Sequence, residues 1–217
     1  MHSPSGTGIL GASIDLSDRR IREISKISGR KRIFLRVGVC VQMKVVMDEK
    51  QIATSLVDLT GRIAAAVPDG TDIAVIGIRS RGEILAQRLA RSLSARLGVT
   101  VPCGTLDITL YRDDINEPRG NTQPTVRSTE IGFDINEKII ILADDVLYTG
   151  RSARAALDAL IDLGRPKAIR LAVLVDRGYH ELPIQADFAG CTVDIPGEQT
   201  VEVRLTETDG IDQVIVE

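Results

Sequence analysis

Three near-continuous apolar runs are spaced along the chain, each long enough for one buried strand. They occupy residues 72–78, 138–145 and 168–175. Runs of this kind are typical of strands that are buried on both faces of a parallel sheet. The intervals around them carry helical patterns, and strands that alternate with helices favour one architecture. The sequence therefore predicts an α/β fold with an open, mostly parallel sheet and helices on both faces.

The first helical pattern lies in residues 48–67, where apolar residues recur at spacings of three and four. Ile52, Leu56 and Ile63 are among them, as on one face of an amphipathic helix. Proline and glycine at 68–70 end that helix. Further helices are expected at 83–97 and 152–163, and further strands at 101–112, 191–195 and 200–205. In such folds ligands bind beyond the carboxyl ends of the strands.

Composition excludes several classes of protein. Hydrophobic residues make up 43% and charged residues 26% of the chain, as in ordinary soluble proteins. No apolar run reaches the ~18 residues of a membrane span, and the N-terminus lacks the apolar core of a signal peptide. Three separated cysteines and two histidines form no metal-binding pattern. We therefore expect a cytoplasmic location with reduced thiols and no membrane partner.

Charge is distributed unevenly along the chain. Residues 1–42 contain eight basic and three acidic residues, a net charge of +5, whereas residues 43–217 contain 19 basic and 27 acidic residues, a net charge of −8. We expect a basic leader, 1–42, before a globular domain, 43–217. The leader suits a nucleic-acid-binding arm. We favour instead a disordered extension or a misassigned start, with Met43 or Met47 as the true one, because regular patterning begins there.

The segment 140–152 carries the strongest functional pattern in the chain. Its apolar strand delivers two adjacent carboxylates, Asp144 and Asp145, and a short loop leads through Thr149–Ser152 into a helix. Backbone N–H groups at a helix N-terminus, with nearby hydroxyls, form a cradle for a phosphomonoester. Gly150 lets the backbone approach the phosphate closely. An ordinary strand-to-helix turn with capping residues shares parts of this pattern, but the whole combination indicates a site for a phosphorylated ribose.

This segment resembles the motif by which type I phosphoribosyltransferases bind 5-phosphoribosyl-1-pyrophosphate (PRPP), and DDVLYTGRS is similar to the version in the PyrR family. The resemblance extends through DITLYRDD (107–114), LGRPKAIRLAVLVDRG (163–178) and ELPIQADFAG (181–190), and covers roughly residues 46–207. Proteins of this family are pyrimidine operon attenuators with uracil phosphoribosyltransferase activity. The resemblance implies the type I phosphoribosyltransferase fold with a small hood and a flexible loop. It also implies conversion of uracil and PRPP to UMP and pyrophosphate, Mg²⁺ as cofactor, and a homodimer or higher homo-oligomer.

The resemblance implies roles for individual residues. The catalytic residues would be Asp144, Asp145 and Arg81. The PRPP-binding segment would comprise Asp144, Asp145, Val146, Leu147, Tyr148, Thr149, Gly150, Arg151 and Ser152. The pyrophosphate loop would comprise Arg79, Ser80, Arg81 and Gly82, in which Ser80 and Arg81 bind the leaving group and a non-proline cis peptide bond is a family feature.

Two further segments would complete the site. Tyr111 and Arg112 begin a polar stretch, 111–130, that resembles the flexible loop, which closes over the site to exclude water. A surface loop without a gating role is the alternative. In the hood, the resemblance implies that Val175 and Arg177 contact the base, that Asp187 helps to hold a second Mg²⁺, and that His180 is a surface residue.

Position 148 separates the substrate classes of the superfamily. In the purine salvage branch an aspartate stands just before the Thr-Gly pair and serves the purine ring. Here the residue is Tyr148, as in the branch that uses uracil. The resemblance therefore implies uracil, and not a purine, as the base.

Regulation through RNA is the point at which the sequence departs from the family pattern. Relatives that bind RNA carry several basic residues on the first helix and near the C-terminal strands. Here the segment 51–62 has Arg62 as its one basic residue, and 191–200 has none. A domain with net charge −8 attracts a phosphate backbone weakly. Two readings stay open: a UMP- and PRPP-responsive regulator that binds the pyr mRNA leader, or a transferase or nucleotide sensor without RNA binding.

Overall fold

The computed structural model describes residues 44–68, 71–113, 128–195 and 199–217. The chain divides into two compact units, 1–39 and 40–217, and every described residue belongs to the second unit. The predicted leader, 1–42, and most of the predicted flexible loop lie outside the described residues. Within the described part, no helix is long and apolar enough to cross a membrane.

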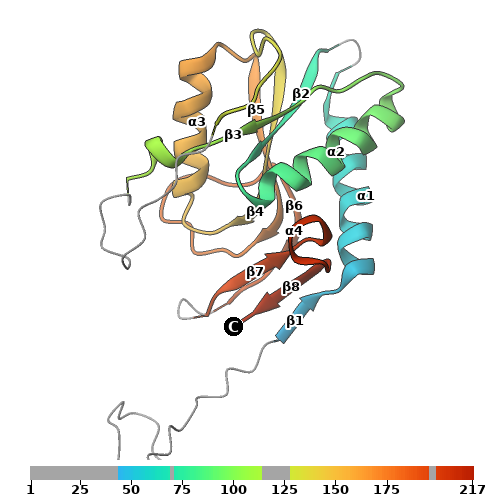
Figure 1. Cartoon of the computed structure of the whole chain (residues 1–217), viewed down its shortest axis with the longest axis vertical. Coiled ribbons are helices and arrows are strands. Elements are labelled where there is room, and N and C mark those ends of the chain that lie inside the picture. Colours follow the sequence, from blue (N-terminus) through green and yellow to red (C-terminus); the bar gives the residue numbers. More distant parts are fainter. Residues whose placement is uncertain (1–43, 69–70, 114–127, 196–198) are drawn as a thin grey trace, which may run out of the picture. The chain divides into compact units, whose positions relative to one another are not determined.

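A parallel sheet of five strands forms the centre of the second unit (Figure 1). Its order is β3-β2-β4-β5-β6, and each neighbouring pair is parallel. The strands are β2 (Ile73–Ile78), β3 (Cys103–Leu106), β4 (Ile139–Leu147), β5 (Ala168–Asp176) and β6 (Phe188–Thr192). The open parallel sheet predicted from the apolar runs is confirmed.

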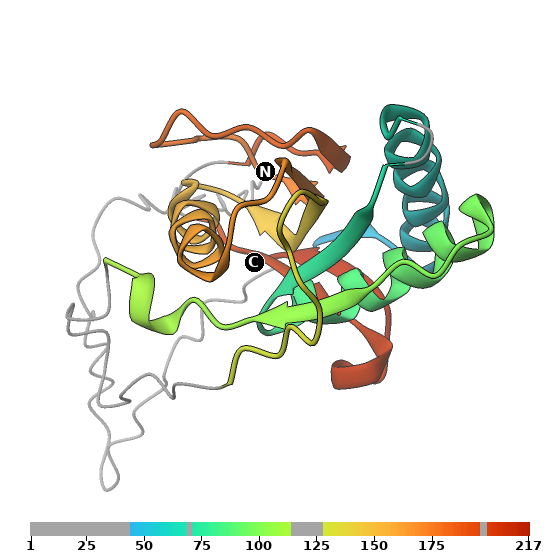
Figure 2. The same ribbon diagram turned by 90° about the horizontal axis from the view of Figure 1, so that it is seen from above.

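Helices cover both faces of this sheet (Figure 2). The helices α1 (Glu49–Ala66) and α2 (Arg81–Leu97) pack on one face, and α3 (Arg151–Leu163) packs on the other. Alternate residues of β4 serve the two faces: Ile140 joins the core under α3, whereas Ile141 joins the core under α1 and α2. A strand buried on both faces needs no polar alternation, which explains its continuous apolar run.

A small antiparallel sheet, in the order β1-β8-β7, accompanies the parallel one. It consists of β1 (Lys44–Met47), β7 (Val201–Arg204) and β8 (Gln213–Val216), with the short helix α4 (Thr206–Asp209) before β8. The sequence analysis predicts neither β1 nor β8. Met47 and Val203 share an apolar core with Leu174 of β5, so this sheet packs against the parallel one.

Several element boundaries differ from the sequence-based prediction. The strand-like segment 101–112 contains the short β3 and then the 3₁₀ turn η1 (Thr109–Tyr111). Helix α2 begins at Arg81 rather than at 83, and β4 continues past the carboxylates to Leu147. Both aspartates therefore belong to the central strand itself, and Gly82 belongs to the first turn of a helix.

Candidate active site

Two adjacent carboxylates, Asp144 and Asp145, lie near the carboxyl end of β4. Both residues are partly buried, and the backbone N–H of Asp145 donates to Oδ1 of Asp144 at 3.0 Å. Burial raises the pKa of the Asp144 carboxyl well above its ordinary range, and the charge of Asp145 raises it further, whereas Arg112 opposes the shift. Carboxylates in such surroundings favour ligands that donate hydrogen bonds, as vicinal hydroxyl groups do.

The loop Tyr148–Gly150 connects β4 to α3. Gly150 has a φ of 89°, which favours glycine, and a Cβ there would lie 3.4 Å from the Cβ atoms of Leu182 and Ile184. Within the described residues no side chain caps the N-terminus of the 13-residue helix α3. The N–H of Arg151 makes a long hydrogen bond of 3.4 Å to Oγ1 of Thr149, and the N–H groups that follow it in the first turn remain available to an anion. This is the geometry that a phosphate cradle needs.

The predicted pyrophosphate loop, Arg79–Gly82, lies beside these carboxylates. Its Arg79–Ser80 peptide bond is cis, as the family resemblance implies. Gly82 packs so closely against β4 that a Cβ would lie 2.6 Å from the carbonyl oxygen of Ala143 and 3.2 Å from Oδ1 of Asp144. The first turn of α2 can therefore approach the carboxylates because residue 82 has no side chain.

The two arginine side chains of this loop contact carboxylates of the protein itself. The Nη2 atom of Arg79 lies 2.9 Å from Oε1 of Glu130, and its Nη1 atom lies 3.3 Å from Oε2 of Glu83. The guanidinium of Arg81 donates to both carboxylate oxygens of Asp209 in α4, at 3.3 and 3.0 Å. No sequence pattern near the loop identifies Asp209, because it lies 128 residues further along the chain.

The predicted base-contacting residue Arg177 lies over the ring of Tyr148, with its Cζ atom 3.9 Å from the ring centroid. Arg177 follows β5, is 5% exposed, and donates its backbone N–H to the carbonyl oxygen of Leu147 at 2.9 Å. The structure thus brings two of the predicted site residues together, from the ends of two neighbouring strands.

The side chains of three other predicted site residues pack in the hydrophobic core. The side chain of Val175 is fully buried beside Leu174 and the small sheet, so a contact of this residue with the base would have to come from its backbone. Leu147 is buried in the core under α3, and Val146 packs against the same cluster as Val175. These residues hold the strand ends in place instead of lining the site.

Hydrogen bonds within the turn that carries Arg177 stabilise it. Nε2 of His180 lies 2.9 Å from Oδ1 of Asp176, which also accepts the backbone N–H of Gly178 at 2.9 Å. The side chain of His180 is 20% exposed, so it is less of a surface residue than the sequence analysis predicts. Asp176 is a site-supporting residue that the sequence analysis does not identify.

The hood and the stem of the flexible loop both contact the phosphate loop. The backbone N–H groups of Glu181 and Leu182 donate to the carbonyl oxygen of Thr149 at 3.0 and 3.1 Å. The side chain of Arg151 contacts Glu181 at 2.8 Å and Asp113 at 2.8 Å, and thereby joins the hood to the loop stem. Glu181 and Asp113 have no polar pattern of their own that would identify them in the sequence.

The loop stem is also fixed to α3. The hydroxyl group of Tyr111 donates to Oδ2 of Asp162 at 2.8 Å, and Nη2 of Arg154 donates to the carbonyl oxygen of Tyr111 at 3.1 Å. Its neighbour Arg112 contributes its charge to the surroundings of Asp144. The remainder of the loop, 114–127, lies outside the described residues.

Asp187 does not reach this site, which corrects the expectation that it helps to hold a metal ion. It precedes β6, and its carboxylate accepts the backbone N–H of Leu171 at 2.9 Å and pairs with Arg170 at 3.0 Å. β6 begins at Phe188 rather than at 191, so Asp187 lies at the amino end of its strand, opposite the edge where the carboxylate pair lies. The described residues contain no group of three or more potential metal-ligating side chains.

The chain is similar to proteins of known family. The model of the phosphoribosyl transferase domain matches residues 48–207. The bifunctional protein PyrR of Limosilactobacillus fermentum is 48% identical over 172 residues, which cover 79% of this chain and 96% of that protein. The bifunctional protein PyrR of Deinococcus deserti is 57% identical over 143 residues, which cover 66% of this chain and 77% of that protein.

A solved structure shows the same fold at lower identity. A hypoxanthine-guanine phosphoribosyltransferase from Bacillus anthracis superposes with a TM-score of 0.60 at 17% identity, covering 82% of this chain and 99% of that one. At this identity the likeness concerns the fold alone. Together with the domain match and the identities near one half, it confirms the predicted family: the chain belongs to the phosphoribosyl transferase domain family and, within it, to the bifunctional PyrR proteins.

Proposed function

We propose that this chain transfers the 5-phosphoribosyl group of PRPP to uracil, giving UMP and pyrophosphate, and that it regulates pyr operon expression through the mRNA leader. The observation that carries the choice of base is the stacking of Arg177 on Tyr148, 3.9 Å from the guanidinium carbon to the ring centroid. By the family resemblance, Tyr148 stands at the position where purine-using relatives have an aspartate. A carboxylate that could serve a purine ring is therefore replaced by an aromatic ring and a cation.

The three segments of the site would divide the substrate between them. Asp144 and Asp145 would accept hydrogen bonds from the ribose hydroxyls, and the N–H groups of Thr149–Ser152 would bind the 5′-phosphate. The loop Arg79–Gly82 would receive pyrophosphate, since Gly82 brings it within contact distance of Asp144. The acceleration of the transfer would then come from positioning of the substrates and from stabilisation of the charge that develops on pyrophosphate.

A magnesium ion fits this donor set. The adjacent carboxylates Asp144 and Asp145 offer hard oxygen ligands, and Mg²⁺ commonly binds one or two carboxylates together with substrate phosphates and waters. When bound, the ion neutralises negative charge on the pyrophosphate group. Asp187 takes no part in this proposal, because its carboxylate is held by Arg170 and Leu171.

The contacts around Arg151 support a water-excluding closure. Its side chain connects Asp113 at the loop stem with Glu181 in the hood, while its own N–H, which contacts Oγ1 of Thr149 at 3.4 Å, would belong to the phosphate cradle. Closure of the loop would keep water from competing with uracil at the glycosidic carbon. Arg151 would thereby link phosphate binding in the cradle to the ordering of the loop stem at Asp113.

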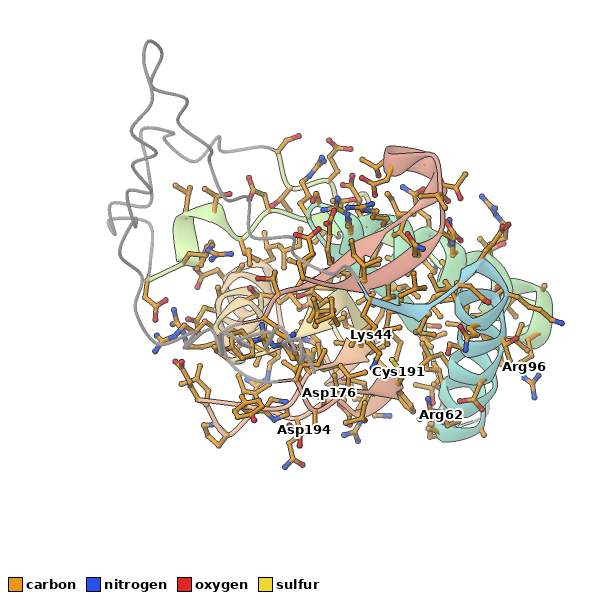
Figure 3. The ribbon with its side chains drawn as sticks, turned by 90° about the horizontal axis from the view of Figure 1, so that it is seen from below. Lys44, Arg62, Arg96, Asp176, Cys191 and Asp194 are labelled. Atoms are coloured by element: carbon orange, nitrogen blue, oxygen red, sulfur yellow. The ribbon has the colours of Figure 1, made fainter. Side chains whose placement is uncertain are left out.

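Binding of the pyr mRNA leader is the second activity that family membership implies. Helix α1 carries two basic residues, Lys50 and Arg62, of which Lys50 lies just before the segment 51–62 considered above. Arg62 projects from α1 (Figure 3). It pairs with Asp58 at 2.8 Å and donates to the carbonyl oxygen of Ala189. Lys50 is the charged residue in the lining of a groove of about 440 Å³ between β1, α1 and the end of β6. The protein therefore offers fewer cations here than RNA-binding relatives, and we expect modest RNA affinity.

One preparation tests both activities. UMP formation from uracil and PRPP with Mg²⁺, and binding of pyr leader RNA with and without UMP, should be measured on the same protein, with light scattering to detect the expected homo-oligomer. UMP formation without RNA binding would support the alternative of a transferase or nucleotide sensor. Absence of UMP formation in active, PRPP-binding protein would contradict the proposed reaction.

A further inference from the structure

Two arginines on one face of α2 hold the C-terminal segment. Arg81 and Arg88 lie about two helical turns apart, so they project from the same side of the helix. Arg81 donates to both oxygens of Asp209, and Arg88 forms close pairs with Asp212 and Glu207. The beginning of α2, which includes the end of the pyrophosphate loop, is therefore fixed to a segment near the end of the chain.

The contact between Arg81 and Asp209 is well defined on both sides. Oδ2 of Asp209 also accepts the backbone N–H of Leu205 at 2.9 Å, and Leu205 is fully buried in the core of the small sheet. The hydrogen bond from Leu205 and that from Arg81 lower the pKa of Asp209, so its carboxylate is ionised at neutral pH. The side chains of Arg81 and Asp209 are 28% and 20% exposed, which makes this pair less solvated than a typical surface pair.

The family resemblance gives Arg81 the task of binding pyrophosphate, but this geometry offers its guanidinium to Asp209. A guanidinium in a two-point pair with a carboxylate must give up those hydrogen bonds before it can bind another anion. In the loop backbone, the N–H of Arg79 donates to the carbonyl oxygen of Leu106 at 3.0 Å, so the N–H groups at the start of α2, where Gly82 lies beside Asp144, are the ones that can meet an anion. The Arg81 side chain thus binds Asp209, and the backbone of the loop is left to bind pyrophosphate.

We propose that Asp209 is a positioning residue for pyrophosphate recognition, acting through Arg81. Asp209 holds the Arg81 side chain on the C-terminal segment and thereby fixes the loop so that its backbone N–H groups meet pyrophosphate. This inference rests on the proposed function and names a residue outside the PRPP motif on which the same site depends. It predicts that loss of either Arg81 or Asp209 weakens pyrophosphate binding to the same extent as loss of both.

A double-mutant cycle tests this proposal. Asp209→Asn, Arg81→Gln and the double variant should be compared by calorimetric titration with magnesium pyrophosphate. Each single change should weaken pyrophosphate binding roughly tenfold, because a displaced loop loses much of its alignment, and the double variant should lose no more than either single one. UMP binding should stay unchanged, since the phosphate cradle on α3 is intact, and Asp209→Glu should restore part of the affinity. Asp58→Asn, which removes an exposed pair on α1, is the matched control.

Two results would overturn the proposal. Tighter pyrophosphate binding by Asp209→Asn would mean that the carboxylate competes with the ligand for Arg81, and additive losses would mean that the two residues act separately. The titration needs no uracil, so the outcome is separable from the proposed reaction. Wild-type protein that binds pyrophosphate through this pair but forms no UMP would contradict the reaction and support the inference.

Discussion

The guanidinium of Arg177 is stacked on the phenol ring of Tyr148, with 3.9 Å between the guanidinium carbon and the ring centroid. The two residues follow neighbouring strands, β4 and β5, and the backbone N–H of Arg177 donates to Leu147 next to Tyr148. A cation over an aromatic face is an attractive arrangement that strengthens when water is excluded. It fixes both side chains at the place to which we assign the choice of base.

The first prediction concerns base choice. Uracil should be converted to its nucleotide with PRPP and Mg²⁺, whereas hypoxanthine and guanine should not, because Tyr148 offers no carboxylate to a purine ring. Assays with each radiolabelled base measure this directly. Replacing Arg177 by Gln should raise the KM for uracil roughly tenfold, as expected for loss of a charge-assisted contact, and leave the KM for PRPP nearly unchanged. Purine nucleotide formation by the wild-type protein would place it in the other branch.

The carboxylate pair gives the second prediction. Changing Asp144 and Asp145 together to Asn keeps their shape but removes the charged acceptors for the ribose hydroxyls. PRPP affinity should fall by roughly tenfold or more, since hydrogen bonds to charged groups are the strong ones. Calorimetric titration with PRPP and Mg²⁺ measures the loss, and Asp72→Asn, at the exposed pair with Lys138, is the control. Unaltered PRPP affinity would refute the assignment.

Sequence patterns predict the central sheet and the phosphate loop because both are local. A buried strand, a short loop and a helix start follow one another in 138–163, so Asp144, Asp145 and Gly150 are placed without knowledge of the rest of the chain. The strands β1 and β8 could not be predicted in this way. Each has four residues, and they pair across nearly the whole described domain.

Partners of the site residues were harder to predict, for the same physical reason. Asp209 meets Arg81, and Glu181 meets Arg151, only once the sheets and helices are assembled. The error at Asp187 arises from the boundary of β6: a shift of three residues turns a hood position into the amino end of a strand. The side chain of Val175 packs in the core because the last residues of a buried strand still face it.

A third prediction compares two helical glycines. Gly82→Ala would place a Cβ 2.6 Å from a carbonyl oxygen of β4, so the start of α2 must move. We expect a loss of about 2 kcal/mol in the free energy of unfolding, typical of overpacking, together with weaker PRPP binding. Gly61→Ala in α1 is the matched control, because its Cβ would meet nothing closer than the Arg96 side chain at 4.0 Å. That change should raise stability by about 0.5–1 kcal/mol. Urea unfolding that ranks the two variants in the opposite order would contradict this packing.

Acid stability provides the fourth prediction. Hydrogen bonds from Arg88 lower the pKa of Asp212 to about 2, below its ordinary value of 3.8. A carboxyl whose folded pKa is lowered stabilises the fold above its unfolded pKa and loses that contribution as the pH falls through the folded value. The stability difference between wild type and Asp212→Asn should therefore be constant above about pH 4 and shrink towards pH 2. With solvent screening the plateau should be about 1–2 kcal/mol. Urea titrations across this range measure it, and a difference that is independent of pH would refute the pairing.

The last prediction concerns RNA and the basic leader together. If residues 1–42 supplied the phosphate contacts, their net charge of +5 would dominate the salt dependence of binding, because the slope of log K against log salt changes by about 0.9 for each contact with duplex DNA. We expect instead that deleting them leaves UMP formation, stability and the salt slope nearly unchanged. Lys50→Gln in the full chain should lower the slope by about one contact, since this lysine is the cation of the α1 groove. A filter-binding salt titration of the full chain, residues 43–217 and Lys50→Gln decides between the two sources of charge. A slope smaller by two or more contacts in the shortened protein would make the leader an RNA-binding arm.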